Sequence, residues 1–300
     1  MTNGCSALEF GLDSKMTLSR RLFLAGAAIS PAAAQKLAPG DPNSPERLAL
    51  IETFEGKIKD LAARFEARTH RPVDGWSMPY RLFRPTNSNG KLPLVLYLHG
   101  SGGTGVDNQK QLTGGNRFGA LLWTLPEVQE LQRCYVAAPQ TDRGWIRYAT
   151  PRTLATKRTQ MPDKVPGLGP GAAAVVDLVK TLTAELSLDD RRIYLCGNSM
   201  GGGGCWHLLA HHGERFAAAV PFCGGASPES GAENPRIPVW NFHGDADETV
   251  NVRISRDRIA ARRKAGGKPL YSEYRGVGHN VSQWAATEPA LPAWLFRQHR

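Results

Sequence analysis

The chain has 300 residues, of which 41% are hydrophobic and 21% charged, and its formal net charge is +10. This composition is typical of an ordinary globular protein that buries a sizeable core. The basic residues are scattered along the chain, and no zinc-finger, helix-turn-helix or RNP signature accompanies them. We therefore expect a solvated basic surface and no nucleic-acid partner.

The first segment reads as an export signal. Paired arginines, Arg20 and Arg21, precede a short apolar run, and small residues at 32–34 form a cleavage site. The order Ser19 to Leu24 is similar to the twin-arginine signal, with Ala25 where lysine is common. We expect residues 1–34 to be removed, Met16 to be the true start, and the product to be periplasmic or extracellular. No later stretch approaches the roughly 18 consecutive apolar residues of a membrane helix.

An N-terminal helical extension is predicted over residues 35–62, and a single catalytic domain over 63–300. Ser-Pro-Glu at residues 44–46 favours a helix start, and apolar residues follow at three- and four-residue spacing. After this helix a hairpin is expected, with strands near Arg64–Thr69 and Pro79–Phe83.

Short apolar runs then alternate with helical stretches. The expected strands are Leu92–Leu98, Arg133–Ala138, Arg192–Leu195, Ala217–Phe222, Val239–Phe242 and Leu270–Tyr274. The expected helices are Gly171–Leu186, the stretch after Ser199 to His212, and Arg253–Lys264. Strands that alternate with helices indicate an α/β fold with a parallel sheet covered on both faces.

A Gly-x-Ser-x-Gly motif, Gly197 to Gly201, lies between a predicted strand and a predicted helix. In that context the motif indicates a nucleophile elbow, a sharp turn that raises the hydroxyl of Ser199 above the sheet. Gly197 and Gly201 are explained if strand and helix approach each other closely there. Gly202 to Gly204 are expected to ease helix packing.

A serine hydroxyl needs a base, and the base needs a group that orients it. In this arrangement the acid comes first in the chain and the histidine second. Asp247 follows a predicted strand, and we prefer it as the acid over Asp245, which we expect to bond its own backbone in a turn. His279 follows the last predicted strand and is the expected base. Its rivals are His99, His207, His211, His212, His243 and His299, with His99 and His243 interpreted as structural.

The oxyanion of a tetrahedral intermediate needs hydrogen-bond donors. The backbone N–H of Met200, directly after the serine, is one candidate. The glycine-rich loop after the strand Leu92–Leu98 offers the other, the backbone N–H of Ser101.

The chain resembles the carboxylesterase and phospholipase-like branch of the α/β-hydrolase superfamily, near dienelactone hydrolases, predicted secreted peptidases and polyhydroxybutyrate depolymerases. The resemblance covers roughly residues 65–298 and rests on blocks at 80–85, 96–108, 138–140, 197–202, 218–225, 243–247 and 278–280. It implies an eight-stranded, mostly parallel sheet and ester hydrolysis without metal or cofactor. Asn198 departs from the leucine or phenylalanine common before the serine.

The cysteines are interpreted as thiols. Cys5 leaves with the signal, and the other four lie in apolar segments, which favours free buried thiols over the disulfides that export permits: Cys134, Cys196, Cys205 and Cys223. The sequence has no CxxC motif, and we expect no metal site.

The loop Gln140 to Gly171 emerges where such sheets bind ligands. It is basic and carries Trp145, Arg147 and Tyr148, which we interpret as substrate contacts; a solvated loop is an equal alternative. The predicted function is a secreted serine carboxylesterase acting on a small-molecule or polymer ester, including polyester or feruloyl-type esters. A serine peptidase is the alternative, and a binding protein without turnover comes last. The sequence leaves the physiological ester and the oligomeric state open.

Overall fold

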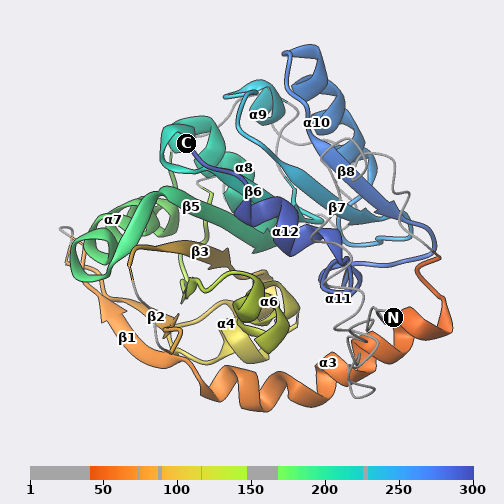
Figure 1. Cartoon of the computed structure of the whole chain (residues 1–300). Helices are drawn as coiled ribbons and strands as arrows, with labels where there is room; N and C mark the ends of the chain where they lie inside the picture. Colours follow the sequence, from red (N-terminus) through yellow and green to blue (C-terminus); the bar gives the residue numbers. More distant parts are fainter. Residues whose placement is uncertain (1–40, 73–74, 87–89, 116, 147–167, 226–228) are drawn as a thin grey trace, which may run out of the picture.

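One eight-stranded sheet forms the centre of the molecule (Figure 1). The computed structural model describes residues 41–72, 75–86, 90–115, 117–146, 168–225 and 229–300. Within them the strand order is β1-β2-β4-β3-β5-β6-β7-β8. The strands are β1 (Glu66–His70), β2 (Met78–Phe83), β3 (Leu92–Leu98), β4 (Tyr135–Pro139), β5 (Leu188–Asn198), β6 (Ala218–Phe222), β7 (Trp240–Gly244) and β8 (Leu270–Tyr274).

Only β2 breaks the parallel arrangement of these strands, since it pairs antiparallel with β1 and β4. The other neighbours pair in parallel. The predicted mostly parallel sheet and the antiparallel hairpin are therefore confirmed. β5 is longer than the expected strand Arg192–Leu195, because its first residue, Leu188, already pairs with Leu92 of β3.

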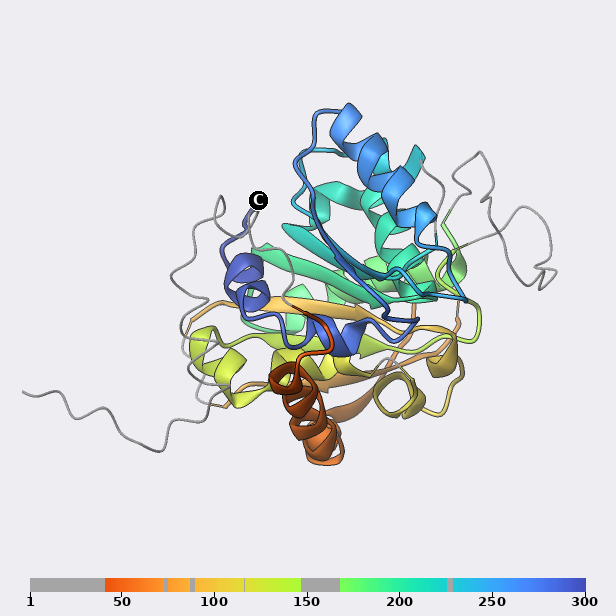
Figure 2. The same cartoon turned by 90° about the vertical axis from the view of Figure 1, so that its right-hand side faces the viewer.

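Helices cover both faces of the sheet, as expected. They are α3 (Pro45–Ala63), α4 (Lys110–Thr113), α5 (Phe118–Leu121), α6 (Pro126–Leu131), α7 (Pro170–Glu185), α8 (Met200–His212), α9 (Glu229–Ala232), α10 (Arg253–Lys264), α11 (Ser282–Ala285) and α12 (Ala290–Phe296). Figure 2 shows the sheet between α10 on one side and α3 on the other.

The two faces follow from the alternation of side chains along the central strands. In β3, Leu94, Leu96 and Leu98 pack with α7 and α8, whereas Val95 and Tyr97 pack with the side that holds α3, α5 and α12. Every residue of β3 is buried, as expected for a strand with helices on both faces.

The N-terminal helix α3 packs into the core rather than lying outside it. The Ser44 side chain caps its first turn, accepting a hydrogen bond from Arg47 N at 3.3 Å. Its buried face includes Phe54, whose ring meets that of Phe118 in α5 edge to face, with ring centroids 4.7 Å apart. Trp284 Nε1 of α11 also donates to Pro42 O, just before the helix, at 2.9 Å. The helix thus reaches the segment that follows β8.

The predicted export signal, residues 1–34, lies outside the described residues. In the part of the chain that the structure describes, no helix has the length and apolarity needed to cross a membrane.

Candidate active site

Ser199 occupies a sharp turn between β5 and α8, with φ 54° and ψ −112°. Its N–H still donates to Phe222 O of β6 at 2.9 Å, and its carbonyl oxygen already accepts from Gly203 N of α8 at 3.0 Å. The residue therefore ends the sheet and begins the helix at once. A positive φ is costly for a non-glycine residue and is concentrated at functional sites. The strand, turn and helix context expected for the motif is present.

The glycines around this turn allow close contact between backbones. A Cβ on Gly197 would lie 2.5 Å from Gly201 O, and a Cβ on Gly201 would overlap Leu98 O at the end of β3. The expectation that strand and helix approach each other closely is confirmed. Gly202 and Gly203 in turn lie against the carbonyl oxygens of Phe222 and Gly225, so the first turn of α8 rests directly on the ends of neighbouring strands.

Ser199, His279 and Asp247 lie in one chain of hydrogen bonds. Ser199 Oγ is 2.8 Å from His279 Nε2, and His279 Nδ1 is 2.7 Å from Asp247 Oδ2. Asp247 follows β7 and His279 follows β8, so both come from the carboxyl ends of strands. With the carboxylate ionised, Nδ1 donates to Asp247 and Nε2 is left to accept the serine proton.

Asp247 is buried and accepts four hydrogen bonds. Oδ1 accepts from the backbone N–H groups of Thr249 and Val250 at 2.8 and 2.9 Å. Oδ2 is within hydrogen-bond distance of His279 and of a second histidine, His243. Burial raises the pKa of the Asp247 carboxyl, but the donors outweigh burial and hold this pKa well below its usual value. The carboxylate is therefore charged whenever the protein is folded near neutral pH.

Asp245 lies in a turn, as expected, but the expected hydrogen bond of its side chain to its own backbone was wrong. Asp245 Oδ1 accepts a hydrogen bond from Gly276 N at 2.6 Å. Gly276 belongs to the loop that leads from β8 to His279. It is Asp247 that bonds backbone N–H groups two and three residues ahead, the pattern expected of Asp245. Thus Asp245 ties the two loops together, while Asp247 holds both its own turn and the imidazole.

His243, interpreted from sequence as a structural residue at a strand end, is part of this network. It lies in β7, and its side chain is fully buried. Nε2 is 3.1 Å from Asp247 Oδ2 and 2.9 Å from Val250 O, while Nδ1 is 2.7 Å from Ser255 Oγ. Two acceptors around Nε2 place the ring proton there, and the serine hydroxyl donates to Nδ1. The four-residue spacing between His243 and Asp247 was the available sequence signal.

The loop after β3 carries Ser101 at the start of a short 3₁₀ turn (Ser101–Gly103). His99 holds this loop from inside: its Nδ1 donates to Gly100 O at 2.7 Å, and its Nε2 accepts from Thr141 N at 3.1 Å. Burial lowers the pKa of His99 to about 4, so the ring is neutral. Gln140 Nε2 adds a bond to Gly103 O at 3.0 Å. The structural interpretation of His99 agrees with these contacts.

Trp145, expected to contact substrate, has no exposed surface. Its indole Nε1 donates to His99 O at 2.9 Å, and its Cβ lies under Gly204 of α8. In this position it supports the loop after β3 instead of forming a pocket wall. Arg147 and Tyr148 lie outside the described residues.

The four cysteines expected as free buried thiols are free and buried: Cys134, Cys196, Cys205 and Cys223. Cys223 follows β6 and has a φ of 38°. Its sulfur lies near Asp247 and His279, and together these three are the residues whose side chains could hold a metal ion in the described part of the chain.

Comparisons with known proteins show that the chain is similar to hydrolases. The sequence profile of the Dienelactone hydrolase family matches residues 151–286. A bifunctional acetylxylan esterase/xylanase, XynS20E of Neocallimastix patriciarum, is 27% identical over 232 residues, which cover 74% of this chain and 30% of that protein.

Solved structures share the fold. The crystal structure of a thermostable esterase is 36% identical and superposes with a TM-score of 0.68, covering 80% of this chain and 64% of that one. A ferulic acid esterase, 15% identical, has a TM-score of 0.56 over 78% of this chain and 97% of its own. The chain spans less than two thirds of the length of XynS20E and of the thermostable esterase. The fold is that of the α/β-hydrolases, as the sequence predicted.

Proposed function

We propose that this chain, which has the fold of the α/β-hydrolases, is a serine hydrolase that cleaves carboxylic esters through an acyl-enzyme intermediate. The observation that carries this proposal is the hydrogen-bonded chain from Ser199 Oγ through His279 to Asp247. Nucleophile, base and orienting acid stand in the order and geometry that acyl transfer requires. The strained backbone of Ser199 and the charged, buried carboxylate of Asp247 support the same assignment.

In the first half of the proposed reaction, Ser199 Oγ attacks the ester carbonyl carbon while its proton moves to His279 Nε2. The imidazolium that forms is stabilised by Asp247 through Nδ1. The intermediate collapses, and the leaving alkoxide takes the proton from Nε2 as alcohol. A water molecule, activated by the same imidazole, then attacks the acyl group on Ser199 and releases the acid.

The oxyanion of each tetrahedral intermediate is proposed to lie between the N–H groups of Ser101 and Met200. Met200 supplies the first amide of α8, and the first amides of a helix have no partner within it. The dipole of this helix also favours negative charge at its start. The loop of Ser101 is held by buried contacts of His99 and Gln140, which supports a preorganised donor.

For the substrate we propose an acetyl or phenolic acyl ester carried on a carbohydrate. The names of relatives in sequence support this choice, since they include an acetylxylan esterase and a feruloyl esterase. Polyester and lipid esters are other outcomes that the substrate panel separates.

The test is hydrolysis of p-nitrophenyl esters from acetate to palmitate, with acetylated xylan and methyl ferulate beside them. Ser199→Ala is the control, because it removes the nucleophile and keeps the fold. Activity on acetate and ferulate that disappears in the control supports the proposal. Cleavage of peptide anilides without any esterase activity would replace it with a serine peptidase, and no turnover in any assay would favour a binding protein.

We further propose that the chain is exported to the periplasm or beyond. The support is the segment Ser19 to Leu24 and the small residues at 32–34. Replacing Arg20 and Arg21 together by lysine keeps the charge and removes the arginine pair that a twin-arginine receptor reads. Retention of this variant in the cytoplasm, with export of the unaltered chain, is the expected result; equal export of both contradicts the signal type.

A further inference from the structure

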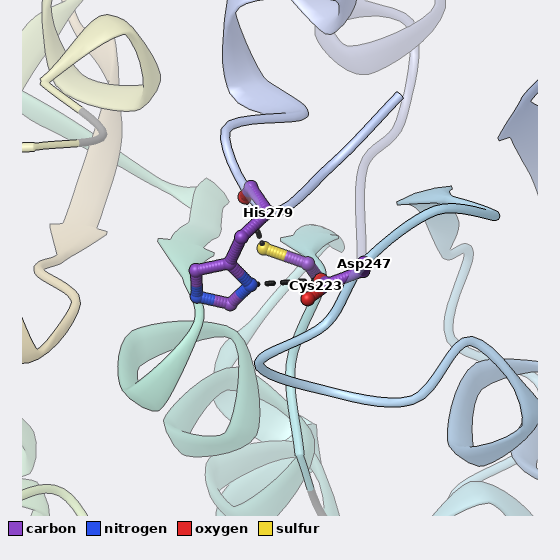
Figure 3. Close-up of side chains that lie close together, drawn as sticks. All are labelled: Cys223, Asp247 and His279. Carbon is purple, nitrogen blue, oxygen red and sulfur yellow. Dashed lines mark hydrogen bonds and ion pairs between the residues drawn. The ribbon is translucent and has the colours of Figure 1, made fainter. Parts of the chain in front are cut away.

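Cys223 places a thiol beside the pair that orients the proposed base. The three side chains come from the segments that follow β6, β7 and β8, and they converge at one point (Figure 3). The sulfur, a carboxylate oxygen of Asp247 and a ring nitrogen of His279 all lie within 4.8 Å of one another. The ester hydrolysis mechanism uses the last two and has no task for the sulfur.

Hydrogen bonds of Cys223 fix the position of its sulfur. Its backbone N–H donates to Phe242 O of β7 at 2.9 Å, and the residue adopts a positive φ of 38°. The thiol in turn points at the His279 segment and is 3.2 Å from His279 O (Figure 3). The sheet therefore holds the sulfur close to the imidazole.

The donor set matches soft and borderline divalent cations. Thiolate, imidazole and carboxylate together are ligands of Zn²⁺ and its heavier relative Cd²⁺, whereas Mg²⁺ and Ca²⁺ prefer oxygen alone. A tetrahedral ion with these bond lengths keeps its ligand atoms roughly 3.3–3.8 Å apart. The 2.7 Å contact between His279 Nδ1 and Asp247 Oδ2 must open by about 1 Å or less, and the sulfur must move inward by a similar amount.

The charges also balance when such an ion binds. The free site contains a buried thiol, an imidazole and one carboxylate. A divalent cation displaces the thiol proton to solvent and binds the thiolate. Two negative ligands then face two positive charges, so a buried site that carried one negative charge becomes neutral.

We propose that Cys223, Asp247 and His279 form an inhibitory site for thiophilic divalent cations, with Cd²⁺ and Zn²⁺ as its ligands. The ion takes the place of the proton on His279 Nδ1, and that proton moves by way of solvent to Nε2. An Nε2 that carries a proton donates to Ser199 Oγ and cannot accept the serine proton. The ion reaches the site past the His279 side chain, which is 21% exposed.

Binding of the ion does not depend on the proposed function, but inhibition rests on it. The two are therefore measured separately. Binding is followed on the Ser199→Ala variant by titrating Cd²⁺ and recording the thiolate-to-cadmium charge-transfer absorption in the ultraviolet. One equivalent of Cd²⁺ should saturate this absorption, and Cys223→Ala in the same background should abolish it. A titration in which both proteins respond alike overturns the site, whatever the enzyme hydrolyses.

Inhibition is followed as the Cd²⁺ concentration that halves esterase activity. Cys223→Ala should raise this concentration by at least about tenfold, because even changes outside the ligands weaken metal sites 10- to 100-fold. Cys134→Ala removes another fully buried thiol, which directly precedes β4 and is not part of the Cys223, Asp247 and His279 cluster, and should leave the sensitivity unchanged. Chelation by EDTA should restore activity, and Mg²⁺ should not inhibit.

Cys223→Ser serves as a second test in case Cys223→Ala does not fold. Cys223→Ser keeps a hydrogen-bond donor toward His279 O but offers no soft ligand, so it should resist Cd²⁺ as the alanine variant does. Equal inhibition of the unaltered enzyme, Cys223→Ala and Cys223→Ser would contradict the site while leaving the esterase assignment intact. If the protein had no esterase activity but bound cadmium as expected, the metal site would be supported and the esterase assignment would be contradicted.

Discussion

His243 and His279 both reach the same oxygen, Asp247 Oδ2, at 3.1 and 2.7 Å. One ring points at Ser199, whereas the other is fully buried and bonded to Ser255. The proposed acid, Asp247, is thus also oriented by His243, whose side chain is buried on the side away from Ser199. His243 is a positioning residue in this arrangement, because it acts on the reaction only through Asp247.

Replacing His243 by phenylalanine should lower kcat about 10- to 100-fold with little change in KM, since one hydrogen bond to a charged group is lost. A carboxylate with one donor fewer attracts the proton of His279 more strongly. The acidic limb of the kcat/KM profile should therefore move to higher pH. His243→Gln carries an N–H close to the position of Nε2 and should restore most of the rate. A fall in kcat without movement of the limb would reduce His243 to a packing role.

Substitution of the two aspartates in the loop after β7 should lower kcat by very different factors. Asp247→Asn presents an amide to His279 Nδ1 and favours the wrong tautomer, so kcat should drop about 10⁴-fold. In Asp245→Asn the amide oxygen can still accept from Gly276 N, and the loss should stay below about tenfold. Steady-state rates of both variants, measured after circular dichroism has verified folding, decide between them. Similar losses in both would reject Asp247 as the orienting acid.

His99 should make folding stability depend on pH. Burial lowers the pKa of His99 from 6.5 to about 4, so the unfolded chain binds more protons than the folded chain between these values. Stability from this group is complete above pH 6.5 and is lost as the pH falls, by about 3 kcal/mol at pH 4. Urea unfolding at several pH values measures it. His99→Asn should flatten the dependence, and the exposed His299→Asn should not alter it.

The close contact at Gly201 predicts a large stability difference between two glycine substitutions. Gly201→Ala places a Cβ against the backbone oxygen of Leu98, which cannot move aside, and should cost about 3 kcal/mol or more. Gly56→Ala lies on the exposed side of α3 with nothing within 4 Å and should stabilise by about 0.5–1 kcal/mol. Thermal unfolding of the pair compares them directly. Equal Tm values would show that the turn tolerates a side chain.

The parts of the site that follow local patterns were predictable from sequence. Ser199 lies in a motif between strand and helix, and Asp247 and His279 each follow an apolar run, so chain order alone was enough to bring them together. The roles of Asp245 and Trp145 were missed because they depend on contacts between loops. Gly276 and His99, their partners, are 31 and 46 residues away. Periodicity carries no information about such pairings.

The residues that surround Asp247 were also hard to predict from sequence. His243 and Cys223 read as ordinary strand residues, since each lies in or beside a short apolar run. His243 lies in β7, four residues before Asp247, whereas Cys223 comes near Asp247 only because β6 lies next to β7 in the sheet. The strands themselves were predicted within a few residues, because buried parallel strands are recognisable as apolar runs. The contacts among the side chains at the ends of these strands were only partly predictable.

The separation of Ser199 from His279 along the chain, 80 residues, has a consequence for biosynthesis. The ribosome delivers the serine and its turn long before β8, the last strand of the sheet. Until β8 joins the edge, no imidazole stands beside the hydroxyl, and the nascent chain carries an inert serine. Helix α3, made first, likewise waits for Trp284. In the proposed hydrolase, the nucleophile therefore lacks its base until the last strand has joined the sheet.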